Sequence, residues 1–329
     1  MRIAAINTVD STRYGVVRGR ELELLHAGAD LYSALSEGTI DLALSGERVL
    51  FDPTGELAVP IPVTSIRDFI TFEQHTAGSV RAVTGNAVVP EAWYEAPAFY
   101  FTNPHAATGN KVDIPIPPGS TEFDFELEVA VVIGRPGYNL TPDEAGDYIA
   151  GYTILNDWSA RDLQRSEMRV GLGPAKGKDT ATSLGPVLVT PDELTDYVDG
   201  DRLALGMAAA VNGIEIGRDS LGSMAWSFAE LISYASRGTW IRPGDVLGSG
   251  TCGGGCFAEF WGWNGQKVPS PLVAGDEVAL TVDGIGTLTN RIAAGPPLHP
   301  LPAARRRKVL QPVLPEAALL SRTNQEGGR

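Results

Sequence analysis

The stretch "EFDFELEVAVVIG", residues 122–134, has the pattern of a buried strand and yet carries acids among its apolar residues. Bulky apolar side chains from Phe123 to Ile133 occupy every second position, and the acids fall on the positions between them. In a strand, residues i and i+2 point the same way. Glu126 and Glu128 are therefore predicted to project side by side into one space.

The residues next to the two glutamates indicate whether this space is solvated or buried. A solvated strand face, common in antiparallel sheets, would explain both acids. The next residues on that face are Ala130 and Val132, which are apolar, so the space is expected to be partly buried. Two carboxylates held together there repel each other, and a hard divalent cation with oxygen ligands removes the repulsion. The pair thus predicts a metal site that needs further carboxylates from elsewhere in the chain.

The segment "GYTILNDWSARDLQ", residues 151–164, offers a third carboxylate. Its apolar half predicts a strand that ends in Asp157, which is well placed as a metal ligand. The alternative, that Asp157 caps the following helical turn, stays open. Arg161 and Gln164 follow on that turn, where an ordinary surface would explain either of them.

The segment "RDFITFEQH", residues 67–75, contributes Asp68 and His75. The chain has four histidines, and the other three lack comparable surroundings. An isolated histidine is more often a surface residue than a catalyst. Beside the carboxylates, His75 would suit a general base, because its ordinary pKa is near neutrality.

Two glycine-rich stretches could bind an anionic group. Residues 171–186, "GLGPAKGKDTATSLGP", carry Lys176 and Lys178 but do not match the phosphate-loop motif. Residues 248–255, "GSGTCGGG", could present backbone N–H groups to a carboxylate or an oxyanion. A tight turn between strands explains the second stretch equally well.

Composition excludes several classes of protein. The chain has 329 residues and a formal charge of −14, from 40 acids against 26 Lys plus Arg, which disfavours nucleic-acid binding. No apolar run approaches the roughly 20 residues of a membrane helix, and "MRIAAINTVD" lacks the apolar stretch of a signal peptide. We therefore expect a cytoplasmic protein in which Cys252 and Cys256 are reduced thiols. By itself this cysteine pair offers two ligands, too few for zinc.

The chain is expected to have three parts. For residues 1–60 the sequence predicts a small α/β domain of short strands and one helix. This domain ends in a linker that contains Pro and Gly. Residues 61–300 predict the catalytic domain, with helix starts at Thr141 and Thr190 and a hairpin near the end. Residues 301–329 predict a surface tail, whose "ARRRK" is better explained by solvation or a subunit contact than by nucleic acid.

In their order along the chain, "DFELEVAVVIG", "GYTILNDWSARDLQ", "AKGKDT" with "LGP", and "GSGTCGGG" resemble the fumarylacetoacetate hydrolase family over roughly residues 61–292. The "RDFITFEQH" segment resembles that of bacterial members. The resemblance implies an α+β, mainly β fold, a mixed β-sandwich roll with a small N-terminal domain. It also implies a homodimer that uses Mg²⁺, with Mn²⁺ or Ca²⁺ as substitutes.

The resemblance also implies roles for individual residues. The implied metal ligands are Asp68, Glu126, Glu128 and Asp157, with Lys176 and Thr180 in support. The implied catalytic residues are His75, Glu259, Lys176, Gln164 and Arg161, with Glu259 orienting the histidine. The implied substrate-binding residues are Ile70, Tyr100, Gln164, Met168 and Thr251. Ile70 and Met168 stand where mammalian-type hydrolases have tyrosines, and this departure leaves the substrate open.

The resemblance favours metal-dependent hydrolysis of a C–C bond in a β-diketo acid, such as an acylpyruvate or fumarylacetoacetate, by water that His75 activates. Decarboxylation of a 2-oxo acid such as oxaloacetate, and isomerisation or hydration of a 2-hydroxydienoate, remain alternatives on the same centre. Decarboxylases of the family that lack this histidine carry a histidine–glutamate pair on a lid, which is not recognisable here. A binding protein on a retired enzyme scaffold is a fourth possibility, against which the full set of site residues argues.

Overall fold

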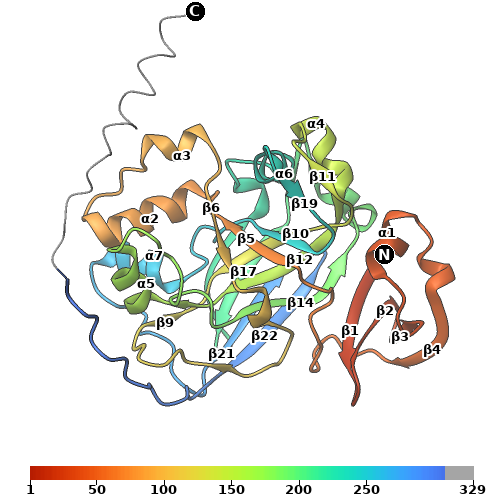
Figure 1. Cartoon of the computed structure of the whole chain (residues 1–329), viewed down its shortest axis with the longest axis horizontal. Helices are drawn as coiled ribbons and strands as arrows, with labels where there is room; N and C mark the ends of the chain where they lie inside the picture. Colours follow the sequence, from red (N-terminus) through yellow and green to blue (C-terminus); the bar gives the residue numbers. More distant parts are fainter. Residues whose placement is uncertain (308–329) are drawn as a thin grey trace, which may run out of the picture. The chain divides into compact units, whose positions relative to one another are not determined.

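The structure, a computed structural model, describes residues 1–307 (Figure 1). Met1–Pro297 form one compact unit. The residues after Pro297 belong to a second unit, which is described only as far as Arg307 and has no helix or strand up to there. The rest of the predicted C-terminal tail lies outside the described residues. Within residues 1–307, no helix is both long and apolar enough to cross a membrane.

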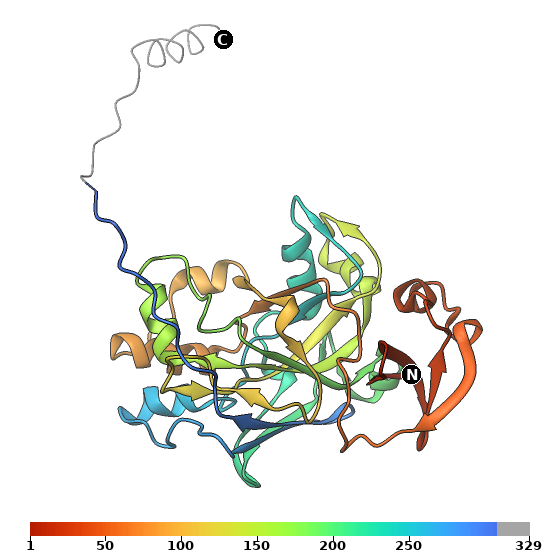
Figure 2. The same ribbon diagram turned by 60° about the horizontal axis from the view of Figure 1, so that its bottom comes forward.

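An eleven-stranded sheet forms the centre of the larger unit. Its order is β4 (Leu44–Leu50), β3 (Glu21–Leu25), β2 (Thr12–Arg18), β1 (Arg2–Asn7), β14 (Thr182–Val189), β12 (Ile149–Asp157), β10 (Leu127–Ile133), β20 (Asp245–Gly248), β5 (Ser65–Phe69) and β6 (Phe99–Thr102), with β7 (Ala107–Thr108) paired to β14. The four strands of the first 50 residues, red to orange in Figures 1 and 2, join the rest through an antiparallel pairing of β1 with β14. The N-terminal segment therefore extends the sheet that carries residues 122–134.

A second sheet packs on one face of the first. It has the order β18 (Ile214–Ser220), β17 (Gly206–Val211), β21 (Glu277–Val282), β22 (Gly286–Ala293) and β8 (Ile114–Pro115). Short pairs join β9 (Phe123–Asp124) with β13 (Ser159–Ala160), β11 (Gly137–Tyr138) with β19 (Trp240–Ile241), and β15 (Val198–Asp199) with β16 (Arg202–Leu203). The predicted mainly β, α+β architecture is confirmed.

The helices are short and lie around the sheets. They are α1 (Leu31–Ser36), α2 (Glu73–Thr84), α3 (Glu91–Glu95), α4 (Pro142–Ala145), α5 (Arg161–Met168), α6 (Phe228–Ser236) and α7 (Phe257–Asn264). The 3-10 turns are η1 (Ile40–Ala43), η2 (Pro104–Ala106), η3 (Gly146–Tyr148), η4 (Pro191–Tyr197) and η5 (Leu221–Ser223). The predicted helix start at Thr141 is a capping box, whereas the one at Thr190 opens a 3-10 turn.

The central strand β10 is buried on both faces, which explains its apolar composition. Leu127, Val129 and Val131 belong to the core between the two sheets. Ala130 and Val132 belong to a second core, which α1 and the N-terminal strands cover. The alternation predicted for this strand is thus confirmed, and the face that carries the acids is closed to solvent.

The prediction of one continuous strand over residues 122–134 is wrong, because the strand is interrupted at Phe125 and Glu126. There the backbone N–H groups bond side chains instead of a neighbouring strand. The N–H of Phe125 bonds the Asp124 carboxylate, and that of Glu126 bonds the Asn156 side-chain oxygen, both at 2.9 Å. The break turns the segment from its pairing with β13 into its pairing with β12.

The shared sheet predicts that the N-terminal strands and the rest of the unit unfold together. Ile3 is fully buried and opposite Leu188 of β14, so Ile3→Ala should lower the free energy of unfolding by about 2–5 kcal/mol. Denaturant unfolding followed by tryptophan fluorescence measures this, because all six tryptophans lie at or after Trp93 and report on the rest of the chain. Val9→Ala, at a fully exposed position, should change the value by less than about 0.5 kcal/mol. An unchanged tryptophan transition in Ile3→Ala would mean that the N-terminal strands unfold separately.

Candidate active site

Four carboxylates from three segments meet at one edge of the large sheet. Asp68 lies near the end of β5, Glu128 in β10, and Asp157 at the end of β12, while Glu126 directly precedes β10. Strands β10 and β12 are antiparallel, with Leu127 opposite Asn156, so the start of one strand lies beside the end of the other. One oxygen from each carboxylate lies within 4.8 Å of the others. The convergence expected from the sequence is present.

A glycine in the intervening strand makes room for this meeting. Gly248 of β20 lies between Asp68 of β5 and Ala130 of β10 in the sheet. A Cβ at Gly248 would lie 2.3 Å from an oxygen of Asp68 and 2.9 Å from an oxygen of Glu128. Any side chain here would therefore displace one of the two carboxylates.

All four carboxyl groups are buried, and their pKa values diverge. Burial raises the pKa of Asp68, Glu128 and Asp157, and the negative charge of Glu126 raises each of these pKa values further. Burial also acts to raise the pKa of Glu126, but the adjacent Arg161 and Lys178 more than offset it and hold that pKa below its ordinary value. Without a bound cation, the cluster thus favours one ionised glutamate beside carboxyl groups that retain protons.

The lysine that reaches the cluster is Lys178. Its ammonium group bonds both Glu126 and Asp157, and the side chain is almost fully buried. Lys176, the lysine predicted from the sequence, is instead 71% exposed and pairs with Asp179 at 2.8 Å. Between them, Gly177 presses against the backbone of α5, where a Cβ would lie 2.7 Å from the nitrogen of Gln164. This contact fixes the path of the chain and directs the second lysine inward.

Arg161 is held between two acids rather than free to contact a substrate. Its guanidinium donates to Asp124 at 2.8 and 2.9 Å and to the Gln164 side-chain oxygen at 3.3 Å, and it forms an ion pair with Glu126 at 2.7 Å. Asp124 also accepts the backbone N–H groups of Phe257 and Ala258, at the start of α7. Asp124 joins the arginine to the helix that carries Glu259, and it is not among the site residues predicted from the sequence. Its signal was visible in the sequence, since Asp124 alternates with apolar residues in the same way as Glu126 and Glu128.

His75 lies on α2 and faces Glu259 of α7. Its Nδ1 is 3.6 Å from a Glu259 oxygen, and its Nε2 is 3.1 Å from the hydroxyl of Ser79. Glu259 is itself held by the side chain of Gln74 at 2.9 Å and the N–H of Gly254 at 2.8 Å. The predicted pairing of a histidine with an orienting acid is therefore present in the geometry.

The close approach of α2 and α7 depends on two glycines. A Cβ at Gly78 would lie 2.6 Å from Glu259, and one at Gly262 would lie 2.2 Å from the carbonyl oxygen of Gly78. With these glycines, the helices lie side by side and Glu259 comes within reach of His75 (Figure 1).

Of the residues predicted to bind substrate, some contact the carboxylate cluster and others do not. The hydroxyl of Tyr100 bonds Asp157, and that of Thr251 lies 3.5 Å from Glu128. Ile70 follows β5 and is partly buried. The Thr180 hydroxyl is buried, with no hydrogen-bond partner among the described residues. Met168, at the end of α5, is half exposed.

The cluster meets the requirements of a hard divalent cation. Carboxylate oxygens are the ligands that Mg²⁺, Mn²⁺ and Ca²⁺ prefer. Within the described part of the chain, one buried oxygen of Asp68 and one of Asp157 have no hydrogen-bond partner. Buried polar atoms are normally paired, so these oxygens are available to a metal ion.

Comparison with known proteins places the chain in a family. Residues 66–293 match the family described as fumarylacetoacetate (FAA) hydrolase C-terminal, which is more than half of the chain. The chain therefore belongs to the fumarylacetoacetate hydrolase family. Its members here include hydrolases, isomerases and tautomerases, so membership defines an enzyme family rather than one reaction.

Three relatives show this range. Oxaloacetate tautomerase YisK of Bacillus subtilis (strain 168) is 36% identical over 173 residues, 53% of this chain and 53% of that protein. The chain thus matches about half the length of that relative. The 2,4-didehydro-3-deoxy-L-rhamnonate hydrolase of Sphingomonas sp. (strain SKA58) is 31% identical over 273 residues, 80% of this chain and 88% of that protein. The structure of 5-carboxymethyl-2-hydroxymuconate delta-isomerase from Mycobacterium smegmatis has 26% identity and a TM-score of 0.65, over 89% of this chain and 100% of that one.

The two lysines allow a matched test of the site. Lys178→Met removes one of the two cations that contact the ionised Glu126 and also the partner of Asp157, and we expect it to lower the free energy of unfolding by about 3–5 kcal/mol at pH 7. Lys176→Met removes an exposed ion pair and should cost less than about 1 kcal/mol. Denaturant unfolding in buffer with EDTA measures both. Equal losses, or a larger loss for Lys176→Met, would contradict the placement of the buried lysine.

Proposed function

We propose that the protein is a divalent-cation-dependent hydrolase that cleaves a C–C bond in a β-diketo acid of the acylpyruvate or fumarylacetoacetate type. The observation that carries this proposal is the buried cluster of four carboxylates close to His75, whose ring faces a further acid, Glu259. A chelating 2-oxo acid suits the cation, and the histidine suits activation of water.

The cation would be held by Asp68, Glu126, Glu128 and Asp157, and Mg²⁺ fits this all-oxygen set, with Mn²⁺ or Ca²⁺ as substitutes. When bound, it supplies Lewis acidity that favours the enolate form of the leaving group. Lys178 adds a fixed positive charge at the same place, because its ammonium is already buried between two of the ligands. Arg161 orients Glu126 and keeps it ionised.

His75 is the proposed general base. Glu259 faces its Nδ1 and favours a proton on that nitrogen, which leaves Nε2 to accept a proton from water. In this tautomer the hydroxyl of Ser79 donates to Nε2 and fixes the direction of the ring, and the reacting water takes the place of that hydroxyl. The proton then moves from the imidazole to the carbon of the leaving enolate, so the histidine acts first as a base and then as an acid.

Oxaloacetate tautomerisation is the second candidate. The observation that favours it is the name of the Bacillus subtilis relative, at 36% identity. Moving a proton between carbon and oxygen needs a cation and a base but no attacking water. The Sphingomonas hydrolase, matched over more of its length, favours hydrolysis instead. The expectations of a homodimer and of a cytoplasmic location remain predictions.

Replacing the histidine tests the proposed mechanism. We expect His75→Ala to lower kcat for acylpyruvate cleavage by roughly 10²- to 10⁴-fold, the usual contribution of a general base. His26→Ala, at an exposed histidine, is the matched control and should retain wild-type turnover. Acylpyruvates, fumarylacetoacetate and oxaloacetate are assayed side by side with Mg²⁺. Full activity of His75→Ala, or oxaloacetate tautomerisation far faster than cleavage of either diketone, would overturn the hydrolase proposal.

The raised carboxyl pKa values predict a pH-dependent effect of Mg²⁺. Without metal, the folded protein keeps protons on Asp68, Glu128 and Asp157 that the unfolded chain releases above about pH 4. Its stability should therefore fall as the pH rises through the raised values. Mg²⁺ needs these groups ionised, so it should raise the melting temperature more at pH 8 than at pH 5.

Thermal unfolding with Mg²⁺ and with EDTA measures this effect. Glu126, whose pKa is lowered, contributes stability above its ordinary pKa that is lost only in stronger acid, outside this window. Glu128→Gln should fold and lose most of the Mg²⁺ effect. A Mg²⁺ effect that is equal at the two pH values, or unchanged in Glu128→Gln, would count against the metal site.

A further inference from the structure

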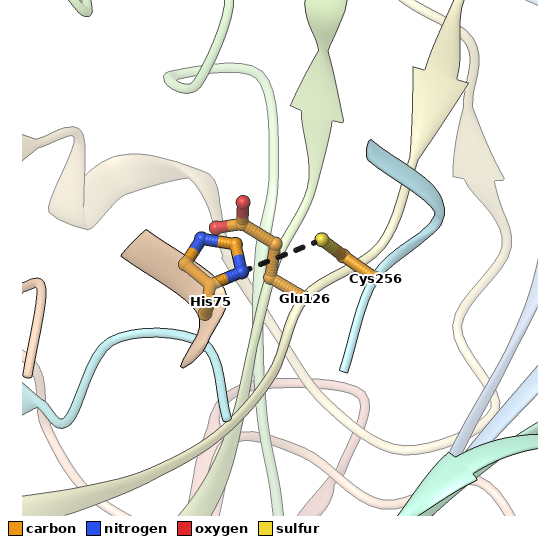
Figure 3. A group of neighbouring side chains, drawn as sticks. All are labelled: His75, Glu126 and Cys256. Carbon is orange, nitrogen blue, oxygen red and sulfur yellow. Dashed lines mark hydrogen bonds between the residues drawn. The ribbon is translucent and has the colours of Figure 1, made fainter. Parts of the chain in front are cut away.

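Beside the four carboxylates lies a second group of possible metal ligands with different chemistry. Figure 3 shows His75, Glu126 and Cys256, which come from α2, the segment before β10 and the residue before α7. The Cys256 sulfur lies 3.7 Å from Nδ1 of His75. One donor atom from each residue lies within 4.8 Å of the other two, and all three residues are buried.

The donor set of nitrogen, sulfur and oxygen is typical of zinc rather than magnesium. Zinc binds imidazole nitrogen at roughly 2.0–2.1 Å and thiolate sulfur at roughly 2.3 Å, so tetrahedral geometry separates these two ligands by roughly 3.6 Å. The observed 3.7 Å between His75 and Cys256 meets this value without movement of either side chain. Ser79 lies 3.1 Å from the other ring nitrogen, where metal-bound histidines usually have a partner.

We propose that His75, Cys256 and Glu126 form a second metal site, which takes a soft divalent ion such as Zn²⁺. The thiol gives its proton to the buffer as the thiolate binds, and a fourth coordination position stays open. Zinc in this site takes the lone pair of Nδ1, so the imidazole proton moves to Nε2 and that nitrogen can no longer accept a proton from water. Zinc therefore inhibits the enzyme while Mg²⁺ at the carboxylate cluster supports it. Binding is independent of the proposed function, whereas inhibition rests on it.

The surrounding charges place limits on the affinity of this site. Arg161 and Lys178 both contact Glu126 and oppose a further cation. Asp124 and Asp157 share these two cations and weaken the opposition, and Glu259 adds a negative charge 3.6 Å from the ligating nitrogen. The site is thus weaker than a closed structural zinc site, and zinc leaves it when a chelator is added.

Cobalt is the probe for binding, because Co²⁺ occupies zinc sites and its bond to a thiolate gives an absorption band in the near ultraviolet. With excess Mg²⁺ present, the wild-type protein should show this band, and Zn²⁺ should remove it. Cys252→Ser, which alters the other buried cysteine of the same loop, is the matched control and should keep the band. Cys256→Ser should lose it, with Cys256→Ala as a second variant if serine is not tolerated. Absence of the band in wild type, or its persistence in folded Cys256 variants, would overturn the site.

Zinc inhibition is measured in the same set of proteins with saturating Mg²⁺. Loss of a residue that only hydrogen-bonds to a metal ligand already weakens metal binding by roughly 10- to 100-fold. Cys256→Ser should therefore need at least roughly tenfold more Zn²⁺ for half-inhibition than wild type or Cys252→Ser. Equal inhibition of all three proteins would mean that zinc acts at the carboxylate cluster, and the inhibitory role would be rejected. If none of the assayed substrates is turned over, the cobalt band still decides whether the site exists.

Discussion

The repulsion among four carboxylates buried at one sheet edge is the constraint on which the rest of the site depends. No arrangement of four ionised carboxylates within 4.8 Å is stable in a closed space without compensating charge. The protein answers in three ways. It retains protons on some carboxyl groups, it brings in Lys178 and Arg161, and it leaves carboxylate oxygens available to a cation.

The chain's own cations are arranged to organise the site rather than to fill it. Arg161 is divided between Asp124 and Glu126, so it holds one ligand in place and keeps it ionised. Asp124 also caps the start of α7, the helix that positions Glu259 against His75. Asp124, which is not one of the four clustered carboxylates, therefore connects the carboxylate cluster to the helix that carries Glu259.

The imidazole of His75 lies close both to the Glu259 carboxylate and to the Cys256 sulfur, and each neighbour suits a different proposed role. In the proposed role of base it faces Glu259, and in the proposed role of metal ligand it lies beside a sulfur that no sequence motif associates with it. The cysteine pair alone offers too few ligands for zinc, and the sequence interpretation stopped there. Folding supplies the remaining ligands from α2 and from the segment before β10, which are more than 100 residues away.

Local pattern determined much of this protein. The alternation along β10 predicted a buried strand, and the acids on one of its faces predicted a meeting of carboxylates that the structure assembles. These features depend on the periodicity of a strand, which is local. The tertiary structure alone decided that Lys178 rather than Lys176 turns inward, because the direction is set by the contact of Gly177 with α5. It also decided the break at Glu126, because the backbone N–H of Glu126 bonds the side chain of Asn156, which lies on the neighbouring strand β12. Such contacts join residues distant in the chain, and no local pattern records them.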